Sequence, residues 1–376
     1  MDADFAIVGA GIAGAALARV LAADAGVLLL ERESQPGLHS TGRSAAMFME
    51  SYGSPQGRAL TRASRALYAA PPADFGDTPV LSPRGALYVG WQGQQALLDA
   101  MQAELQATGS TIERLDAAAT LARVPVLRAD GLAGALWEAD AMDIDVQVLH
   151  QGLLRGARRH GAGVLCDAEV VQAVHDGRAW TVTLADGRTL RARRLINAAG
   201  AWADELARRC GSRALGVQPR RRSAFTFDAP PGVAFRGWPV TAAIAEHWYF
   251  KPDAGQLLGS PANADPVPAH DVVAEELDIA IGIAAIEADT TLRIRRPRRT
   301  WAGLRSFAPD GEMLIGFDEA GLFWLAGQGG WGIQSAQGAA LLAAALLRGE
   351  ALPEALRREG VDVPALSPRR RPPQGD

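Results

Sequence analysis

Phe5-Ala-Ile-Val-Gly9-Ala-Gly11-Ile-Ala-Gly14 stands at the start of this 376-residue chain and decides the expected fold. Residues 5–8 are typical of a short buried strand, and residues 15–23 carry apolar side chains at helical spacing. A second apolar strand, residues 27–30, ends at Glu31. This order of strand, glycine-rich loop, helix, strand and acidic residue predicts a dinucleotide-binding unit.

Each glycine of the loop has its own role. Gly9 permits the tight turn, Gly11 lets the backbone approach a pyrophosphate, and Gly14 lets helix and strand pack closely. The helix N-terminus presents free N–H groups and a partial positive charge to the phosphates. Glu31 is placed to accept hydrogen bonds from a ribose diol. This loop alone does not distinguish FAD from NAD.

The next polar segment favours a flavin. His39-Ser-Thr-Gly-Arg-Ser-Ala-Ala46 supplies hydroxyl groups, one arginine and a glycine on a short loop. These groups suit further phosphate contacts and a ribityl chain.

At this point the chain resembles the D-amino-acid oxidase superfamily of FAD enzymes, and more closely the bacterial D-arginine dehydrogenases. The resemblance covers nearly the full length. It is carried by Gly37-Leu-His-Ser-Thr-Gly-Arg-Ser-Ala-Ala46, Val124-Pro-Val-Leu-Arg128, Asn197-Ala-Ala-Gly-Ala-Trp202, Arg221-Arg-Ser-Ala-Phe225, Lys251-Pro-Asp-Ala-Gly255, Leu258-Gly-Ser-Pro-Ala-Asn-Ala-Asp265, Trp301-Ala-Gly-Leu-Arg-Ser-Phe307 and Gly327-Gln-Gly-Gly-Trp-Gly-Ile-Gln334.

The resemblance implies an α/β (α+β) two-domain fold. A Rossmann-like FAD-binding domain of the glutathione-reductase type would be joined to a substrate domain with a mixed sheet. We expect the FAD-binding domain to be discontinuous, with residues 1–78, 142–214 and 300–363. Residues 79–141 and 215–299 would form the substrate domain, and residues 364–376 a flexible tail.

Several further elements are expected from the local pattern. They are a helix over residues 146–159, a strand over 164–171, a hairpin over 180–194 with an Asp-Gly turn, a strand over 195–200, a loop over 261–268 and a helix from about Ser335.

FAD is expected to bind without a covalent link, because neither cysteine lies in a flavin-facing motif. The expected contacts are Gly9, Gly11, Ala13, Gly14, Glu31, Arg32, Ser40, Thr41, Arg43, Ser44, Ala45, Ala46, Met47, Val170, Ala199, Gly200, Trp202, Gly303, Gly329, Gly330, Trp331, Gly332 and Ile333.

The resemblance also implies five catalytic residues. Arg222 and Arg305 match the positions that grip the substrate carboxylate, for which arginine offers a bidentate fork. Tyr249 matches a tyrosine that helps to hold that carboxylate, and Tyr52 one on a mobile loop that closes over the substrate. Gln334 matches a side chain near the flavin and the substrate amine.

Strand alternation separates two neighbouring arginines. If Ala224 faces the same side as Arg222, then Arg221 points to the opposite face of its strand.

The expected reaction is the oxidative deamination of a D-amino acid to a 2-oxo acid and ammonia, by hydride transfer from Cα to flavin N5. The sequence contains no evident His–carboxylate pair or Ser/His/Asp triad, which is compatible with a cofactor that carries the chemistry. The protein would supply position and charge.

Two departures from the D-arginine dehydrogenases bear on specificity. Ala86 stands where they carry an acid for the substrate guanidinium, and Met47 stands where they carry a histidine. Phe48 and Met49 make the same segment more apolar. Val240 and Ala242 fall where the relatives have apolar pocket residues. We therefore expect a preference for apolar over basic D-amino acids.

Other functions stay open at this stage. They are a glycine or sarcosine-type amine oxidase, a 2-hydroxy-acid oxidase, an accessory flavoprotein subunit of an electron-transfer complex, and a nicotinamide-only dehydrogenase. The electron acceptor, whether O2, a quinone or a protein, is not indicated, and neither is the oligomeric state.

Composition limits the remaining classes. The net charge of −4 gives no bias toward nucleic acid. Two cysteines cannot form a disulfide framework or a metal site by themselves, so no metal is expected. The longest apolar run, residues 336–347, is too short to cross a bilayer. A cytoplasmic location is expected, with membrane association through the electron acceptor left open.

Overall fold

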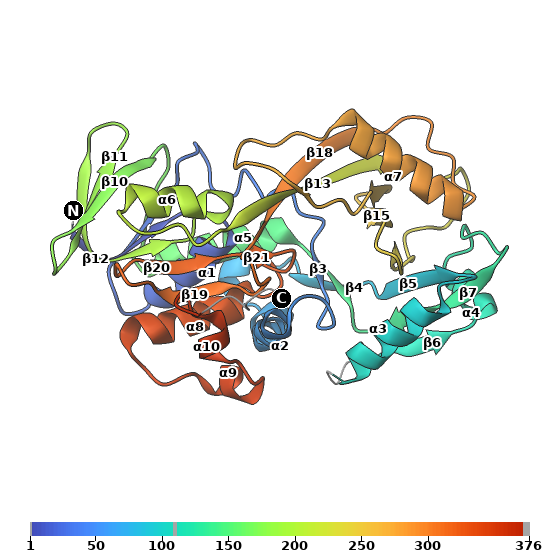
Figure 1. Ribbon diagram of the computed structural model, residues 1–376, viewed down its shortest axis with the longest axis horizontal. Coiled ribbons are helices and arrows are strands. Elements are labelled where there is room, and N and C mark those ends of the chain that lie inside the picture. The colour runs from blue at the N-terminus through green and yellow to red at the C-terminus, as the bar shows by residue number, and fades with distance from the viewer. Residues whose placement is uncertain (1, 108–110, 371–376) are drawn as a thin grey trace, which may run out of the picture.

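The computed structural model describes residues 2–107 and 111–370, which form two halves, each built around its own sheet (Figure 1). Within these residues, eight strands form the first sheet. They are β1 (Asp2–Val8), β2 (Val27–Leu30), β9 (Gly163–Leu165), β10 (Val170–His175), β11 (Trp180–Leu184), β12 (Thr189–Asn197), β19 (Leu314–Phe317) and β20 (Phe323–Ala326). Strand β1 lies centrally and pairs in parallel with β2 and β12, as expected for a dinucleotide-binding sheet.

The two faces of this sheet bury different side chains because residues alternate along a strand. Ile7 and Leu29 are fully buried toward a layer of helices, whereas Ala6 and Leu28 face the opposite cluster, which includes α6. The helices of this half are α1 (Ile12–Leu21), α2 (Pro55–Ala69), α5 (Val146–Arg159), α6 (Ala203–Arg209), α8 (Ala336–Arg348), α9 (Glu354–Arg358) and α10 (Val363–Leu366), with short 3-10 turns η1 (Ala73–Phe75) and η2 (Gly200–Trp202).

The expected elements of this half are present, with shifted boundaries. Helix α1 begins at Ile12, before the predicted start at residue 15, because Gly11 is its N-cap. The strand predicted over residues 164–171 is instead two strands, β9 and β10. Between them Asp167 has a φ of 48°, which turns the chain out of the extended conformation. Strand β12 joins the second hairpin strand to the first half of the strand predicted over residues 195–200, and Gly200 begins the 3-10 turn η2 instead.

The second half contains a ten-stranded sheet within the described residues. Its strands are β5 (Ala86–Trp91), β6 (Glu113–Leu115), β7 (Leu132–Glu138), β13 (Gln218–Phe227), β14 (Val240–Ala243), β15 (Tyr249–Asp253), β16 (Gln256–Ser260), β17 (Asp265–Pro266), β18 (Arg299–Phe307) and β21 (Gln328–Gly329). Helices α3 (Gln95–Ala107), α4 (Ala117–Arg123) and α7 (Glu276–Asp289) accompany this sheet, and β3 (Met47–Phe48), β4 (Leu81–Pro83) and β8 (Met142–Ile144) form a small third sheet. β17 interrupts the loop predicted over residues 261–268.

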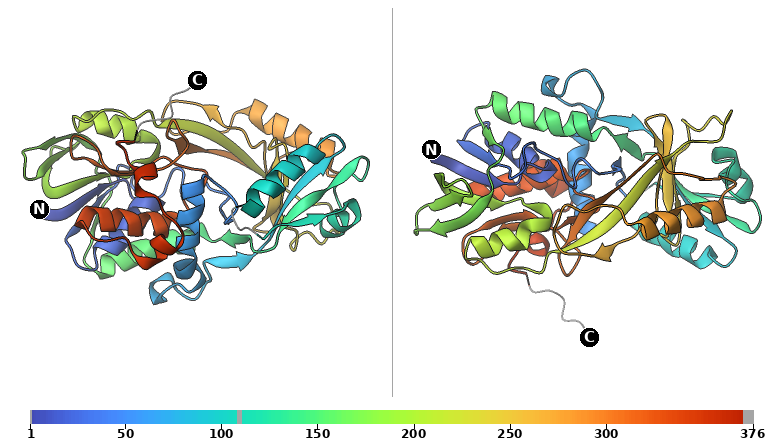
Figure 2. Two further views of the ribbon diagram at one scale, coloured as in Figure 1. Left: turned by 60° about the horizontal axis from the view of Figure 1, so that its bottom comes forward. Right: turned by 90° about the horizontal axis from the view of Figure 1, so that it is seen from above.

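The long antiparallel strands β13 and β18 run from the first half toward α7 in the views of Figures 1 and 2. Their register pairs Arg222 with Gly303. Although residues 300–363 are expected in the FAD-binding domain, β18 belongs to the ten-stranded sheet. The division into domains stays a prediction, and this boundary passes through a strand.

The end of the described chain is held in place. Residues 364–370, predicted as part of a flexible tail, include most of α10, and Arg370 forms an ion pair with Asp310. The rest of that predicted tail, residues 371–376, lies outside the described residues. No helix in the described ranges is both long and apolar enough to cross a membrane.

Candidate active site

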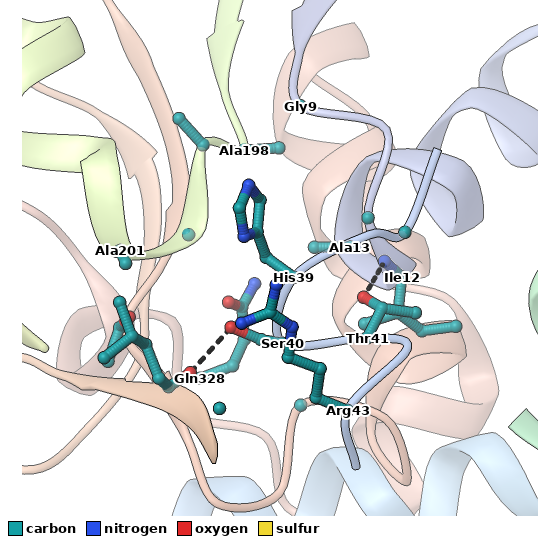
Figure 3. Close-up of a pocket in the computed structure, with 18 of the residues that line it drawn as sticks. Gly9, Ile12, Ala13, His39, Ser40, Thr41, Arg43, Ala198, Ala201 and Gln328 are labelled. Atoms are coloured by element: carbon teal, nitrogen blue, oxygen red, sulfur yellow. Dashed lines mark hydrogen bonds between the residues drawn. The ribbon is translucent and has the colours of Figure 1, made fainter. Parts of the chain in front are cut away.

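A large cavity lies where the loops after β1, β2 and β12 meet the ten-stranded sheet (Figure 3). On one side its lining contains residues at or just after the ends of these parallel strands, such as Val8, Glu31 and Ala198. From the ten-stranded sheet the lining includes Arg222 and Arg305. The carboxyl ends of parallel strands are the usual ligand-binding edge of such sheets. The cavity therefore joins the dinucleotide loop to the second half of the molecule.

The glycine loop fits its expected role on steric grounds. Gly9 has a φ of 106°, and a Cβ there would lie 2.3 Å from the Ala198 carbonyl oxygen. A Cβ on Gly14 would lie 1.9 Å from the carbonyl oxygen of Gly9, so Gly14 is needed for packing and does not line the cavity. Gly11 caps α1 without a side-chain hydrogen bond, and the Ile12 N–H donates to Thr41 Oγ1 over 3.0 Å (Figure 3). The helix N-terminus thus opens on a cavity suited to phosphate.

Glu31 is buried beside this loop. Its carboxylate accepts hydrogen bonds from the backbone N–H groups of Ala10 and Glu33, at 3.0 and 3.1 Å. Since a carboxylate offers about four acceptor positions, others remain for a ribose diol.

An aromatic group borders the same part of the cavity. The Arg32 guanidinium lies 4.2 Å from the centre of a Trp202 ring, and the His39 ring is 4.8 Å from that of Trp202. His39 also contacts Glu33 through Nε2, at 2.9 Å, and this hydrogen bond, together with Arg32, lowers the pKa of Glu33. His39 is therefore engaged at the cofactor end of the cavity.

Arg43 lines the cavity, but its donors are directed to the protein. Nη1 donates to the Val272 carbonyl at 2.7 Å, and Nη2 forms an ion pair with Asp271. Ser40 similarly donates to the Leu304 carbonyl at 2.6 Å. These contacts tie the predicted ribityl loop to the second half, and their role toward a cofactor stays a prediction.

The structure brings nearly all the predicted cofactor contacts together. Those that line the cavity are Gly9, Gly11, Ala13, Glu31, Arg32, Ser40, Thr41, Arg43, Ser44, Ala45, Ala46, Met47, Val170, Ala199, Gly200, Trp202, Gly303, Gly329, Gly330, Gly332 and Ile333. Trp331 is outside the lining and packs behind the Tyr52 loop, where a Cβ on Gly53 or Gly57 would collide with its indole. It supports the loop instead of lining the cavity.

Arg222, Arg305 and Tyr249 form the wall of the cavity that the ten-stranded sheet provides. Neither guanidinium forms an ion pair with any residue in the described ranges; Arg222 Nε donates to the Asn263 carbonyl at 2.6 Å. Burial and the neighbouring charge of Arg305 lower the pKa of Arg222. Burial alone would raise the pKa of Tyr249, but the charges of Arg305 and Arg222 outweigh it and lower that pKa. This wall carries excess positive charge and suits an anion.

The alternation of β13 confirms that Arg221 points away from the cavity. Its Nε lies 2.8 Å from Asp278 Oδ2, and its guanidinium also pairs with Glu275, both on or beside α7. Arg222 and Ala224 line the cavity on the other face of the strand.

Gln334 holds the loop between β3 and α2, which carries Tyr52. The Gln334 amide receives a hydrogen bond from Met49 N–H and donates to the carbonyls of Met49 and Tyr52, at 3.0–3.1 Å. Tyr52 lies outside the cavity lining, with its hydroxyl 3.2 Å from Arg305 Nη1. Both amide hydrogens of Gln334 and one acceptor position of its Oε1 are therefore bound to the loop. Gln334 also lines the cavity, and its role toward a substrate amine stays a prediction.

An apolar cluster continues from Tyr249 along the same face of the ten-stranded sheet. It contains Met49, Ala86 and Val240, with Tyr88 packed against it. Phe48 does not share this environment, because it is buried in the first half against Tyr68. Ala242 pairs with Tyr249 in register and so faces the same side.

Sequence reasoning missed part of the lining. Val8, Leu30 and Ala198 end or follow parallel strands, and the rule for such sheets would have found them. Gln328, Ser306 and the Glu169–Arg209 ion pair carry no comparable signal. Lys251, the chain's single lysine, is buried against Asp143 at 2.8 Å.

Comparisons with known proteins identify the family of this chain. The family model DAO, described as FAD dependent oxidoreductase, matches residues 4–346. N-methyl-L-tryptophan oxidase of Salmonella arizonae is 28% identical over 72% of this chain and 75% of its own length. The enzyme of that name from Citrobacter koseri is 29% identical, but over only 45% of its length.

Solved structures share the fold over nearly the whole chain. Glycine oxidase from Geobacillus kaustophilus superposes with a TM-score of 0.85 at 22% identity, covering 98% of this chain and 99% of its own. L-proline dehydrogenase from P. horikoshii gives a TM-score of 0.81 at 19% identity, covering 98% and 97%. The fold class and the family resemblance expected from the motifs are confirmed. The chain belongs to the DAO family of FAD-dependent oxidoreductases.

Proposed function

We propose that this FAD-dependent amine oxidoreductase acts on D-amino acids and releases 2-oxo acids and ammonia after hydrolysis of the imino acid. The observation that carries the proposal is the pair Arg222 and Arg305, which face the cavity of the dinucleotide loop without a carboxylate partner among the described residues. The α-carboxylate of a substrate would supply the missing negative partner of these guanidinium groups.

The side chains would position the substrate while FAD, when bound, supplies the acceptor for the Cα hydride. Arg222 and Arg305 would hold the carboxylate, with the hydroxyls of Tyr249 and Tyr52 as further donors. The amine would then be oriented toward Gln334, which lines the same cavity. We assign no side chain as the base, and the α-ammonium proton would pass to solvent.

Apolar substrates are favoured by the cluster of Met49, Ala86 and Val240 beside Tyr249. Burying an unpaired distal cation there would cost several kcal/mol, as an order of magnitude. Glu138 lies directly across from Ala86 in register, but it does not line the cavity that holds the arginines. We therefore propose a preference for apolar over basic side chains.

A second candidate is the oxidation of glycine or N-methyl amino acids, which the names of the relatives favour. N-methyl-L-tryptophan oxidase and glycine oxidase are among the similar proteins, and the first of these names refers to an L-configured substrate. The same carboxylate anchor would serve such substrates.

Anaerobic flavin reduction distinguishes these candidates. The purified holoenzyme is mixed with D- and L-forms of methionine, leucine, phenylalanine, lysine and arginine, and separately with glycine, sarcosine and N-methyl-L-tryptophan. Bleaching of the flavin band by apolar D-amino acids supports the proposal. Bleaching only by L-forms, glycine or N-methyl amino acids contradicts it. The same samples, exposed to air or to a quinone, identify the electron acceptor.

A further inference from the structure

Glu138 is a buried acid with an unusual partner. It ends β7, is 5% exposed, and its Oε2 accepts a hydrogen bond from Ser51 Oγ at 2.5 Å. It forms no ion pair with any residue within 2–107 or 111–370. Buried carboxylates are normally paired with a cation, so the retention of this one calls for a role beyond packing.

The partner of Glu138 precedes Tyr52 in the loop that approaches the arginines. Gln334 holds this loop from the cavity side, through the backbone of Met49 and Tyr52. The Ser51 hydroxyl is held separately, by Glu138. The loop is thus fastened on two sides, and each fastening side chain is almost fully buried.

A continuous path of contacts leads from Glu138 to the anion site. Glu138 holds Ser51, the next residue is Tyr52, and the Tyr52 hydroxyl lies 3.2 Å from Arg305 Nη1. A shift of Ser51 would therefore move the Tyr52 hydroxyl relative to Arg305. By contrast, Glu138 itself does not line the cavity.

We propose that Glu138 is a positioning residue, which anchors Ser51 and thereby keeps the Tyr52 hydroxyl beside Arg305. The inference rests on the proposed function, because it assumes that the Arg305 site receives a carboxylate.

The surroundings of Glu138 make this anchor sensitive to pH. Burial raises the pKa of Glu138 to about 7; the hydrogen bonds from Ser51 act against this rise, and Glu50 and Asp140 add to it. Tyr88, from β5, faces the same group, and its own pKa is raised by burial and by Glu138.

On the other side of the loop, Arg58 of α2 donates to the Ser51 carbonyl and pairs with Glu104 of α3. The ionised carboxylate is the better acceptor for the Ser51 hydroxyl. The anchor is therefore strong above pH 7 and weakens as the pH falls through about 7.

The test compares Glu138→Gln with wild type and with Asp140→Asn, which removes a nearby exposed acid outside the anchor. Glu138→Gln should retain its flavin and its maximal rate of flavin reduction. Its KM should rise about tenfold, the equivalent of one hydrogen bond. The rise in wild-type KM between pH 8 and pH 6 should disappear. Asp140→Asn should keep the wild-type KM and most of the pH dependence.

Ser51→Ala provides a second variant should Glu138→Gln fail to fold. It should raise KM to a similar extent, and the double variant should show no additional loss, because both changes break one contact. Wild-type KM and pH profile in Glu138→Gln, or in Ser51→Ala if only that variant folds, would overturn the inference.

A ligand titration separates this inference from the proposed function. Binding of benzoate, a simple carboxylate, is followed by the perturbation of the flavin spectrum without turnover. If no amino acid reduces the flavin but benzoate binds about tenfold more weakly to Ser51→Ala, the proposed reaction fails and the anchor stands. Equal affinities of wild type and Ser51→Ala for benzoate would contradict the positioning role of Glu138.

Discussion

The Tyr52 hydroxyl accepts a hydrogen bond from Arg305 Nη1 at 3.2 Å, across 253 positions of sequence. A Cβ on Gly330 would lie 2.8 Å from that hydroxyl and 3.0 Å from Arg305 Nη1, so the glycine leaves space for the pair. The two residues come from different elements, a loop and strand β18, and meet at the edge of the cavity.

Tyr52→Phe should keep the loop but lose this contact. We expect kcat/KM to fall by the equivalent of about 1.5–3 kcal/mol, the range for a hydrogen bond to a charged group. Most of the loss should appear in KM. Stopped-flow flavin reduction over a range of substrate concentrations measures both parameters. An unchanged kcat/KM would show that the hydroxyl does not contribute to substrate binding.

Arg222→Ala and Arg221→Ala should separate a site arginine from a structural one. Arg222→Ala removes a guanidinium from the cavity and should cost about 1.5–3 kcal/mol in kcat/KM. Arg221→Ala leaves the buried Asp278 carboxylate without its cation and should lower the free energy of unfolding by about 3 kcal/mol. Steady-state kinetics and urea unfolding on both variants check the assignment. A loss of kcat/KM in Arg221→Ala and a loss of stability in Arg222→Ala would show that the two roles are assigned to the wrong residues.

The pH dependence of binding should report Tyr249. Its pKa is lowered by Arg305 and Arg222, so the phenol ionises below pH 10, the ordinary range for tyrosine. The phenolate would repel a substrate carboxylate and neutralise the arginines, so KM should rise as the pH increases through this lowered pKa. Tyr249→Phe should abolish that alkaline rise while raising KM at neutral pH. A rise that persists in the variant must come from another group.

Gly11→Ala and Gly14→Ala should damage the cofactor loop in different ways. Gly11 has a φ of −69°, which alanine accepts, and its nearest neighbour to an added Cβ is Thr41 Oγ1 at 3.2 Å. This variant should fold normally but retain less FAD, because the methyl group enters the cavity. In Gly14→Ala the methyl meets backbone, so stability should fall by about 1–3 kcal/mol. Thermal unfolding and the ratio of flavin to protein absorbance distinguish the two effects.

The first fifty residues were predictable because strand, loop and helix are neighbours in sequence. Short continuous apolar runs and glycine spacing indicate β1, β2 and the cavity edge directly. The boundary between β9 and β10 was not predictable in this way, since it depends on the left-handed backbone of Asp167 in a mostly apolar run.

The anion site was predictable only through motif resemblance. Nothing local to Arg305 distinguishes it from an exposed arginine; its environment is created by β13 and the Tyr52 loop. The contacts of Gln334 and Glu138 with the loop could not be predicted for the same reason, since each joins segments 87 to 285 residues apart.

The pleat of β13 has a consequence for comparing this chain with its relatives. Three consecutive arginines, residues 220–222, let an alignment slide by one place with almost no penalty, yet each step exchanges the inward and outward side of the strand. The arginine of a homologue that is equivalent to Arg222 is therefore the one whose side chain faces the cavity in the alternation of the strand. Residue identity alone does not find it. A one-residue deletion here would leave the composition nearly intact, yet it would turn the guanidinium at the position of Arg222 away from the cavity and toward α7.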